Sequence, residues 1–488
     1  MSREPDGRRR RWCPGLAMSA ILAAVVLALS ADGQNTDNVC GHPPVPVNAK
    51  LVRDGAKATF VCDDGYRLFG SESITCSSNG AWTGDLPFCG TNVAVHKPTN
   101  QSTTARGGSS GNANDGDPTT VHDGRRCTET LKEPSPWWSV DLLQPYPVRA
   151  VSITTRGCCG HQPLQDIEIR VGNSSAELQR NPLCSWFPGT IEEGTTKILS
   201  CARQIVGQHV FLQLVGVEGS LSLCEVEVYS TEEFSIDRCA PGSSSAKTDV
   251  AVFDNKCYEF NVNRGASFAD ARQKCQATGG DIVYGFRGSS STFLAAELER
   301  RKSRLKTQLI WIGAQKEPGL TSRTWKWVNG DVITKPTWGK DQPNNYNGEQ
   351  NCVVLDGGRE WLWNDVGCNL DYLHWICQYT PTTCGSPDIK VNSTIASPYT
   401  FKVSSVIEYV CPEGHATQGS AKRTCGSNGF WTGSAPSCKY VDCGPLNGIE
   451  NGTITLEDNG MTTFQIDGQI YLQPELQSVK WRRQKDMC

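Results

Sequence analysis

The side chains best suited to chemistry are gathered in a short stretch, residues 342–365. Five of them carry oxygen donors: Gln342, Asn344, Glu349, Asn364 and Asp365. A hard divalent cation such as calcium takes about six to eight oxygen ligands, both carboxylate and amide. Two carboxylates would balance the charge of the ion, and three amides would add oxygens while leaving room for the hydroxyls of an outside ligand. Pro343 favours a rigid turn, with a cis peptide bond as one form of it. The alternative is an ordinary polar surface loop.

Aromatic and cysteine motifs on both sides of this stretch indicate the fold that positions it. They are Cys275, W-I-G at 311–313, W-K-W-V-N-G at 325–330, Cys352, Cys368 and W-I-C at 375–377. Together they resemble a C-type lectin domain, an α+β fold, over residues 239–379 (module C below). The resemblance implies that one Ca²⁺ and a carbohydrate are bound by the same residues, Gln342, Asn344, Glu349, Asn364 and Asp365. It also implies the disulfides Cys239–Cys257, Cys275–Cys377 and Cys352–Cys368.

The resemblance leaves the identity of the sugar open. In that family Glu-Pro-Asn accompanies mannose-type ligands and Gln-Pro-Asp galactose-type ligands, whereas Gln342 and Asn344 are both amides. A carboxylate only accepts hydrogen bonds, while an amide also donates them. Asn345 and Gln350 stand where the family's auxiliary calcium site has acids, so a second calcium in this module is not expected.

Two helices are predicted in module C. Ser267 with Asp270 is a capping box that opens a helix reaching about Cys275. The apolar residues of the second helix lie on one face: Phe293, Leu294, Leu298 and Leu305. We interpret the Lys, Arg and Glu residues of 294–306 as a solvated face.

Composition points to an oxidising compartment. The chain has 488 residues, 23 of them Cys, and a net charge of −4, which allows three to four disulfide-stabilised domains. A basic run before the apolar residues 16–29 predicts a signal peptide, residues 1–33, with a signal anchor as the alternative, and no later stretch is apolar enough to span a membrane. No basic patch with interleaved aromatics suggests nucleic acid. Four sequons fit secretion: Asn100, Asn173, Asn392 and Asn451.

Two distant segments are copies of one another. Residues 38–90 (module A) and 383–439 (module D) each hold four cysteines, and both end in a C-x-S-N-G-x-W-T-G pattern followed by Pro and Cys. Each is too small to be stable without staples. Both resemble sushi modules, which are small, disulfide-rich and β. The resemblance implies the pairs Cys40–Cys76, Cys62–Cys89, Cys384–Cys425 and Cys411–Cys438, with Trp82 and Trp431 in the small cores.

Residues 91–230 (module B) alternate apolar and polar residues between turn signals, which predicts a β-sandwich. The pieces N-A-N-D-G-D at 112–117, R-G-C-C-G at 156–160 and L-C-E-V-E-V-Y at 223–229 resemble the fucolectin (F5/8-type) domain. That family would pair Cys127–Cys224, Cys184–Cys201 and Cys158 with Cys159. Its structural calcium site would comprise Asn112, Asp115, Asp117, Cys224 (through its carbonyl) and Glu225, although an Asx-rich turn without metal is the alternative.

The sugar site of module B matches its family less well. The resemblance places Arg156, Cys158 and Cys159 beside the sugar. The family's His position is occupied by Glu129, and its second Arg position by Gln162. We therefore expect module B to bind calcium but not fucose.

The remaining segments are short connections and one incomplete module. Linkers at 230–238 and 378–383 predict a semi-rigid string of modules. Residues 443–488 resemble the start of a third sushi module but lack its cysteine pattern, so we expect them to be disordered.

The order of the modules is similar to that of insect furrowed-type, selectin-like adhesion proteins. This resemblance implies a secreted or extracellular calcium-dependent lectin acting in cell adhesion or cell recognition, with cell-surface glycans or glycoproteins as partners and a longer form anchored in the plasma membrane. The alternative is a protein-binding scaffold whose sushi modules carry the partner contacts. No nucleophile motif such as G-x-S-x-G accompanies the seven His, so an enzyme is not expected.

Overall fold

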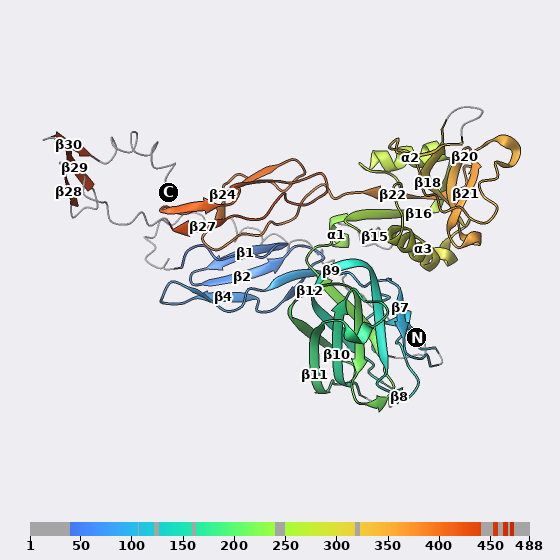
Figure 1. Ribbon diagram of the computed structural model, residues 1–488, viewed down its shortest axis with the longest axis horizontal. Helices are drawn as coiled ribbons and strands as arrows, with labels where there is room; N and C mark the ends of the chain where they lie inside the picture. Colours follow the sequence, from blue (N-terminus) through green and yellow to red (C-terminus); the bar gives the residue numbers. More distant parts are fainter. Residues whose placement is uncertain are drawn as a thin grey trace, which may run out of the picture.

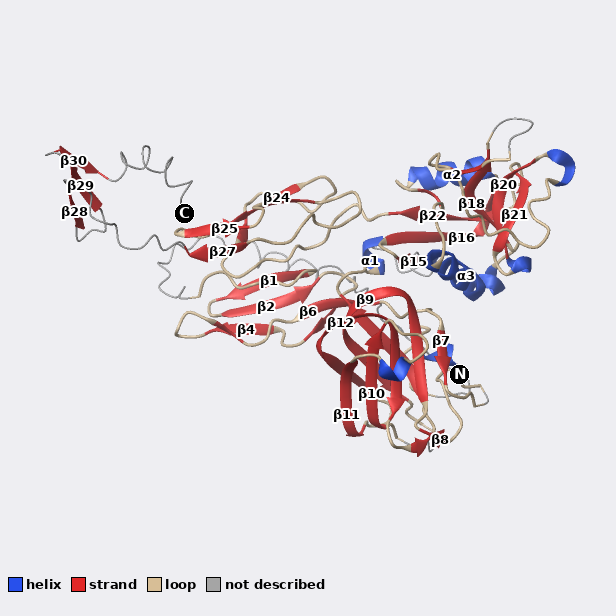
Figure 2. Ribbon diagram, in the orientation of Figure 1, coloured by secondary structure: helices blue, strands red, loops and turns tan. Residues whose placement is uncertain are grey.

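The computed structural model describes residues 40–105, 107–121, 126–158, 163–239, 249–317 and 323–440, and three further strands near the C-terminus. Strands dominate, and the longer helices lie against the sheet of module C (Figures 1 and 2). The fold is therefore mostly β, as predicted. The predicted signal peptide, residues 1–33, lies outside the described residues. Within the described part of the chain, no helix combines the length and apolarity needed to cross a membrane.

Disulfides staple every module, and the predicted pairing is confirmed for nine bonds. They are Cys40–Cys76, Cys62–Cys89, Cys127–Cys224, Cys184–Cys201, Cys239–Cys257, Cys275–Cys377, Cys352–Cys368, Cys384–Cys425 and Cys411–Cys438. Cys158 is also disulfide-bonded. Its predicted partner, Cys159, lies outside the described residues.

Modules A and D are small β units with matching tryptophans. Trp82 Nε1 donates to the Gly41 carbonyl at 3.0 Å, and Trp431 Nε1 donates to the Gly385 carbonyl at 3.1 Å. Trp431 is buried and Trp82 is half-buried against its core. The strands of module A are β1 (Ala49–Asp54), β2 (Lys57–Cys62), β3 (Arg67–Phe69), β4 (Ser73–Cys76), β5 (Trp82–Thr83) and β6 (Phe88–Asn92); those of module D are β23 (Thr394–Ile395), β24 (Val406–Val410), β25 (His415–Gln418), β26 (Lys422–Thr424) and β27 (Ser437–Tyr440).

Module B is the predicted β-sandwich. Its two longest strands pair antiparallel with register shifts midway, so the sheet bends around a core of aliphatic residues. The sheet order is β11-β10-β12-β9-β14-β6-β3, and it continues into module A through the pairing of β14 with β6. Its elements are β7 (Thr99–Gln101), η1 (Ser110–Ala113), β8 (Glu133–Pro134), β9 (Trp137–Thr155), β10 (Gln165–Gly172), η2 (Leu178–Arg180), β11 (Leu183–Thr190), β12 (Thr196–Leu214), β13 (Glu218–Gly219) and β14 (Leu223–Ser230).

Module C is a mixed sheet, of order β15-β16-β22-β18-β20-β21, with two longer helices and a short one at its start. Strands β18 and β22 run parallel, and the other pairs are antiparallel. Its elements are α1 (Ile236–Cys239), β15 (Val250–Phe253), β16 (Lys256–Ala266), α2 (Phe268–Ala277), β17 (Asp281–Ile282), α3 (Ser289–Arg301), η4 (Lys302–Arg304), β18 (Leu309–Lys316), β19 (Trp325–Trp327), η5 (Tyr346–Gly348), β20 (Gln350–Asp356), η6 (Gly357–Arg359), β21 (Leu362–Gly367) and β22 (Leu373–Tyr379).

Both predicted helices of module C are present, with two corrections. The second helix ends at Arg301, so Leu305, predicted on its apolar face, lies beyond η4 in extended conformation. The Ser267 hydroxyl caps α2 by accepting from the backbone N–H of Asp270 at 3.3 Å, as predicted. The interpretation of the charges on α3 as a solvated face is wrong for Glu297 and Arg301, which are 2% and 0% exposed. The Arg301 guanidinium pairs with the Glu297 carboxylate and lies 4.0 Å from the centroid of the Phe260 ring. These contacts make burial of the charge possible.

The modules pack more closely than the predicted string. Modules A and D lie side by side (Figure 1), joined by a bridge between Val45 and Ile389. The Asp63 carboxylate accepts from the backbone N–H and the hydroxyl of Ser386 at 2.8 and 2.9 Å. The two copies of the repeat, far apart in sequence, therefore contact each other directly.

The C-terminal segment contains three strands, β28 (Gly452–Leu456), β29 (Thr462–Ile466) and β30 (Gln469–Leu472), paired in one antiparallel sheet. Over these residues the structure differs from the expected disorder of 443–488. Hydrogen bonds between neighbouring strands supply order without the missing cysteines. The rest of that prediction lies outside the described residues.

Candidate functional site

The oxygen-rich loop of module C is held against strand β21. The peptide bond between Gln342 and Pro343 is cis, which is the form considered from the sequence. The Asp365 carboxylate, 0% exposed, accepts from the backbone N–H groups of Asn344 at 2.9 Å and Asn345 at 2.7 Å, one on each oxygen. Asp365 therefore fixes the loop at the strand, which brings the predicted ligands from both segments together.

The other four predicted ligands of module C differ in their hydrogen-bond partners and in their exposure. Gln342 Oε1 is buried and has no hydrogen-bond partner among the residues that the structure describes. Asn364 donates through Nδ2 to Asp356 Oδ2 at 3.1 Å, which orients its amide, and Asn344 Oδ1 accepts from the N–H of Tyr346 at 3.0 Å. Glu349 is exposed at the end of η5 and, within the described residues, makes no hydrogen bond or ion pair to the other four.

These residues fit a hard cation. A buried carbonyl oxygen without a donor is costly and is expected to have a partner. The Gln342 oxygen is such an atom, and calcium is the type of ion that amide and carboxylate oxygens suit. The described residues hold no group of three or more His, Cys, Asp or Glu side chains placed to bind a metal by themselves. The module C set does not depend on such a group, since only Glu349 and Asp365 of its five members are carboxylates.

The second predicted calcium set, in module B, is assembled in part. Glu225, 2% exposed, accepts through Oε1 from the backbone N–H of Gly116 at 3.3 Å, which places it beside the loop of Asp115 and Asp117. Glu225 Oε2 is buried without a partner. Burial, followed by the nearby Asp115 charge, raises the pKa of Glu225 to about 9. An orphaned acid oxygen in an acidic surrounding fits a cation.

Three other members of the module B set have protein partners, among them Asp115, whose Oδ1 accepts from the backbone N–H of Asp117 at 2.9 Å. The Asp117 carboxylate accepts from Thr119 and pairs with Arg126 at 3.3 Å, and its hydrogen bonds with Thr119 lower its pKa. Asn112 Nδ2 donates to the Cys127 carbonyl at 3.0 Å. Cys224 is 0% exposed. The structure therefore places Glu225 beside the loop of Asp115 and Asp117. The Asp117 carboxylate, however, is already bound to Thr119 and Arg126.

Arg156, one of the predicted sugar residues of module B, forms an ion pair with Glu129, the residue at the family's His position. Arg156 Nη1 lies 3.4 Å from Glu129 Oε1, and the Arg156 side chain is only 9% exposed. Sequence reasoning identified Glu129 as an acceptor in place of a donor but missed this ion pair. No sequence signal marks the pair, because the two residues are 27 positions apart. Gln162 lies outside the described residues.

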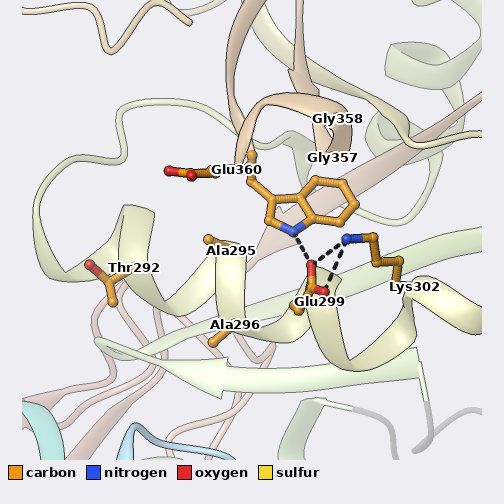
Figure 3. A pocket seen from close by; sticks show the side chains of 9 residues that line it. Thr292, Ala295, Ala296, Glu299, Lys302, Gly357, Gly358 and Glu360 are labelled. Atoms are coloured by element: carbon orange, nitrogen blue, oxygen red, sulfur yellow. Dashed lines mark hydrogen bonds and ion pairs between the residues drawn. The ribbon is translucent and has the colours of Figure 1, made fainter.

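A surface cavity of about 530 Å³ lies on another side of module C (Figure 3). It opens between α3 and the turn at 357–361, and small residues such as Ala295 and Gly357 leave the space. Part of its polar wall is paired, since Glu299 accepts from Trp361 Nε1 at 2.9 Å and from Lys302 Nζ at 3.1 Å. None of the predicted ligand residues lines it.

The predicted glycosylation sites have different surroundings. Asn100 and Asn173 are exposed on module B. Asn392 is half-buried at the contact between modules A and D, where its backbone N–H donates to the His42 carbonyl at 2.9 Å. Asn451 lies outside the described residues.

Family models match each module. The NedA-like, galactose-binding domain family (F5/8 type C) matches residues 112–212, the lectin C-type domain matches 264–379, and the sushi repeat matches 40–89 and 384–438. Lectin and sushi domains are non-enzymatic families typical of extracellular proteins.

Curated relatives align with module B. Fucolectin-5 of Anguilla japonica is 38% identical over 161 residues, which are 32% of this chain and 83% of that protein. Fucolectin of Anguilla anguilla is 39% identical over 147 residues, covering 28% of this chain and 89% of the relative. A solved fucose binding module from Streptococcus pneumoniae is 26% identical and covers 29% of this chain and 99% of its own, with a TM-score of 0.26.

Proposed function

Because the chain belongs to the fucolectin family through module B, and carries a C-type lectin module and two sushi modules beside it, we propose that it is an extracellular, calcium-dependent carbohydrate-binding protein. Its role would be in cell adhesion or cell recognition, with glycans or glycoproteins of a cell surface as partners. Module C is the proposed sugar-binding module.

One observation carries this proposal. The loop that holds the unpartnered, buried Gln342 oxygen is fastened to the fully buried Asp365 by two hydrogen bonds. A carboxylate with this exposure is expensive to bury unless it is paired with a cation or fully hydrogen-bonded. Calcium bound at this point would supply the positive charge and coordinate the hydroxyls of a sugar.

The residues of the loop would then select the ligand. Gln342 and Asn344 can each offer an oxygen to the ion and an N–H to a sugar hydroxyl, because amides both accept and donate. Glu349, which is exposed, only accepts. The proposed ligand is therefore a sugar with neighbouring hydroxyls that can accept hydrogen bonds from amides as well as donate to oxygen.

Module B would have a different role. The Arg156 guanidinium that faces the sugar in the fucolectin resemblance is paired with Glu129, which supports the loss of fucose binding. The unpartnered Glu225 oxygen supports a structural calcium in this module. Such an ion would rigidify the sandwich without taking part in sugar recognition.

The test is a glycan array probed with the full chain, with calcium and with chelator, alongside the variant Asp365→Asn. We expect calcium-dependent signals for a restricted set of glycans, lost in chelator and in the variant. Asp371→Asn is the matched control, since it makes the same change at an exposed position of module C. Cell binding that resists the chelator and survives Asp365→Asn would favour the protein-binding scaffold instead.

A further inference from the structure

Module B projects one apolar residue out of its own core. Leu142 is 0% exposed inside module B, whereas the adjacent Leu143, 6% exposed, belongs to the hydrophobic core of module C. Leu143 has φ 67°, and its N–H donates to Asp141 Oδ1 at 2.8 Å. The register of β9 against β12 shifts here. An irregularity of this kind redirects a side chain, and a positive φ at leucine persists only where surrounding contacts impose it.

A buried lysine lies at the same contact. Lys97 of module B is 6% exposed, and its Nζ lies 4.4 Å from the ring centroids of both Phe253 and Phe293 of module C. A desolvated ammonium over aromatic rings is a favourable pairing. Two acids near it, Glu233 and Glu297, offset the cost of burying its charge.

Glu233 connects three segments. Its buried carboxylate accepts from the Tyr146 hydroxyl of module B at 2.7 Å, from the N–H of Phe234 at 3.1 Å and from the N–H of Asn255 of module C at 3.2 Å. Its backbone carbonyl accepts from the Tyr66 hydroxyl of module A at 3.0 Å. One residue of the supposed linker therefore contacts modules A, B and C.

The residues that follow reach module D. The Phe234 ring stacks on Phe430 with centroids 4.7 Å apart, and Arg238 Nη2 donates to the Gly429 carbonyl at 2.8 Å. The Ser235 hydroxyl donates to the Asp64 carbonyl of module A at 2.8 Å. Residues 233–238 are thus the place where all four modules meet.

We propose that module B is an intramolecular docking module whose partner is module C, and that residues 233–238 pin the pair to modules A and D as one cooperatively folded head. This is a function of module B separate from sugar or calcium binding, and it does not rest on the proposed lectin activity. It predicts that the sugar-facing loop of module C has a fixed position relative to the sushi pair.

Hydrogen exchange of the full chain tests the docking. Leu143→Ala should speed exchange of the slow amides in β16 and β22 of module C as well as those in β9 of module B, by roughly a hundredfold, the size of a large-to-small change in a core. Leu131→Ala, at a 54% exposed leucine of module B, should change neither. Faster exchange confined to module B, or no change in either module, would overturn the proposal.

A second pair of variants tests the same contact in case Leu143→Ala fails to fold. Lys97→Met keeps most of the side-chain volume but removes the charge beside Glu233, and Lys132→Met makes the same change where the side chain is 70% exposed. By calorimetry the unmodified head should unfold in one transition. Lys97→Met should lower the temperature of that single transition without splitting it, and Lys132→Met should leave the temperature unchanged. Separate transitions for modules B and C in the unmodified chain, or a Lys97→Met effect on one module alone, would contradict cooperative docking.

Discussion

Replacing Asp365 by Asn is the sharpest test of the calcium site. The substitution conserves shape but removes the charge and one of the two acceptor oxygens. One backbone N–H, of Asn344 or Asn345, then faces an amide N–H. We expect a cost of about 1–3 kcal/mol in calcium-free buffer. The larger effect should be the loss of the stabilisation that calcium provides.

The size of that stabilisation follows from binding to the folded state alone. At a calcium concentration of about 100 times the dissociation constant, the gain is about 2.7 kcal/mol. With an unfolding entropy of about 2.1 cal/mol/K per residue, this raises the melting temperature by about 9 °C if the ~140 residues of module C unfold alone. The rise is only about 3 °C if the ~400 residues of the four-module head unfold together.

The assay is thermal unfolding of the full chain in calcium and in chelator, with a calcium titration by calorimetry. We expect a calcium-induced rise in the unmodified chain and in Asp371→Asn, and a greatly reduced rise in Asp365→Asn. Because module B has its own predicted calcium set, a small residual rise belongs to Glu225, and Glu225→Gln in the same background should remove it. An equal rise in the unmodified chain and in Asp365→Asn would refute the assignment.

Two further predictions concern module B: the pH dependence of stability that arises from His96, and the loss of fucose binding. Burial, followed by the nearby Arg300 charge, lowers the pKa of His96 from 6.5 to about 4, so the stability tied to its neutral ring is present above pH 6.5 and lost as pH falls through about 4, a loss of about 3 kcal/mol at pH 4. His96→Asn, which suits the local φ of 56°, should flatten the fall in urea midpoint between pH 7 and 4, and an unchanged slope would exclude His96 as the cause. In the Asp365→Asn background, titration calorimetry should detect no fucose binding tighter than about 1 mM, because losing two donors worth ~1.5–3 kcal/mol each weakens binding by at least two orders of magnitude; sub-millimolar binding would overturn the reading of Glu129 as a blocking residue.

The sequence was most informative where chemistry is local. The family resemblances supplied the pairing of the nine disulfides, which joins cysteines as far as 102 residues apart, whereas cysteine spacing and the repeated W-T-G pattern alone marked modules A and D as copies of one unit. The same holds for the Ser267 cap, since the capping hydroxyl and the N–H it satisfies are three residues apart. Such features depend on neighbours in the chain, so a single sequence contains the information needed to predict them.

Contacts between modules could not be predicted in this way. Leu142 and Leu143 are equally apolar, and only the conformation of β9 decides that they enter different cores. Glu297 and Arg301 have the i, i+4 spacing of an exposed helical pair, and they are buried because module B covers α3. Asp356, which orients Asn364, carries no motif at all. For Leu143, Glu297 and Arg301 the deciding partner is distant in sequence, whereas Asp356 lies only eight residues from Asn364, on the neighbouring strand of module C.

The position of module B would let one lectin-like module support another whether or not module B itself binds sugar. Its sheet continues into module A through the pairing of β14 with β6. At its other contact, Leu143 packs in the core of module C and Lys97 lies over the Phe253 ring. Neither contact involves Arg156 or Glu129, so a sugar site closed by their ion pair would leave both contacts intact. We therefore expect substitutions of Leu143 or Lys97 to change hydrogen exchange and thermal unfolding of module C, whereas substitutions of Arg156 should change neither.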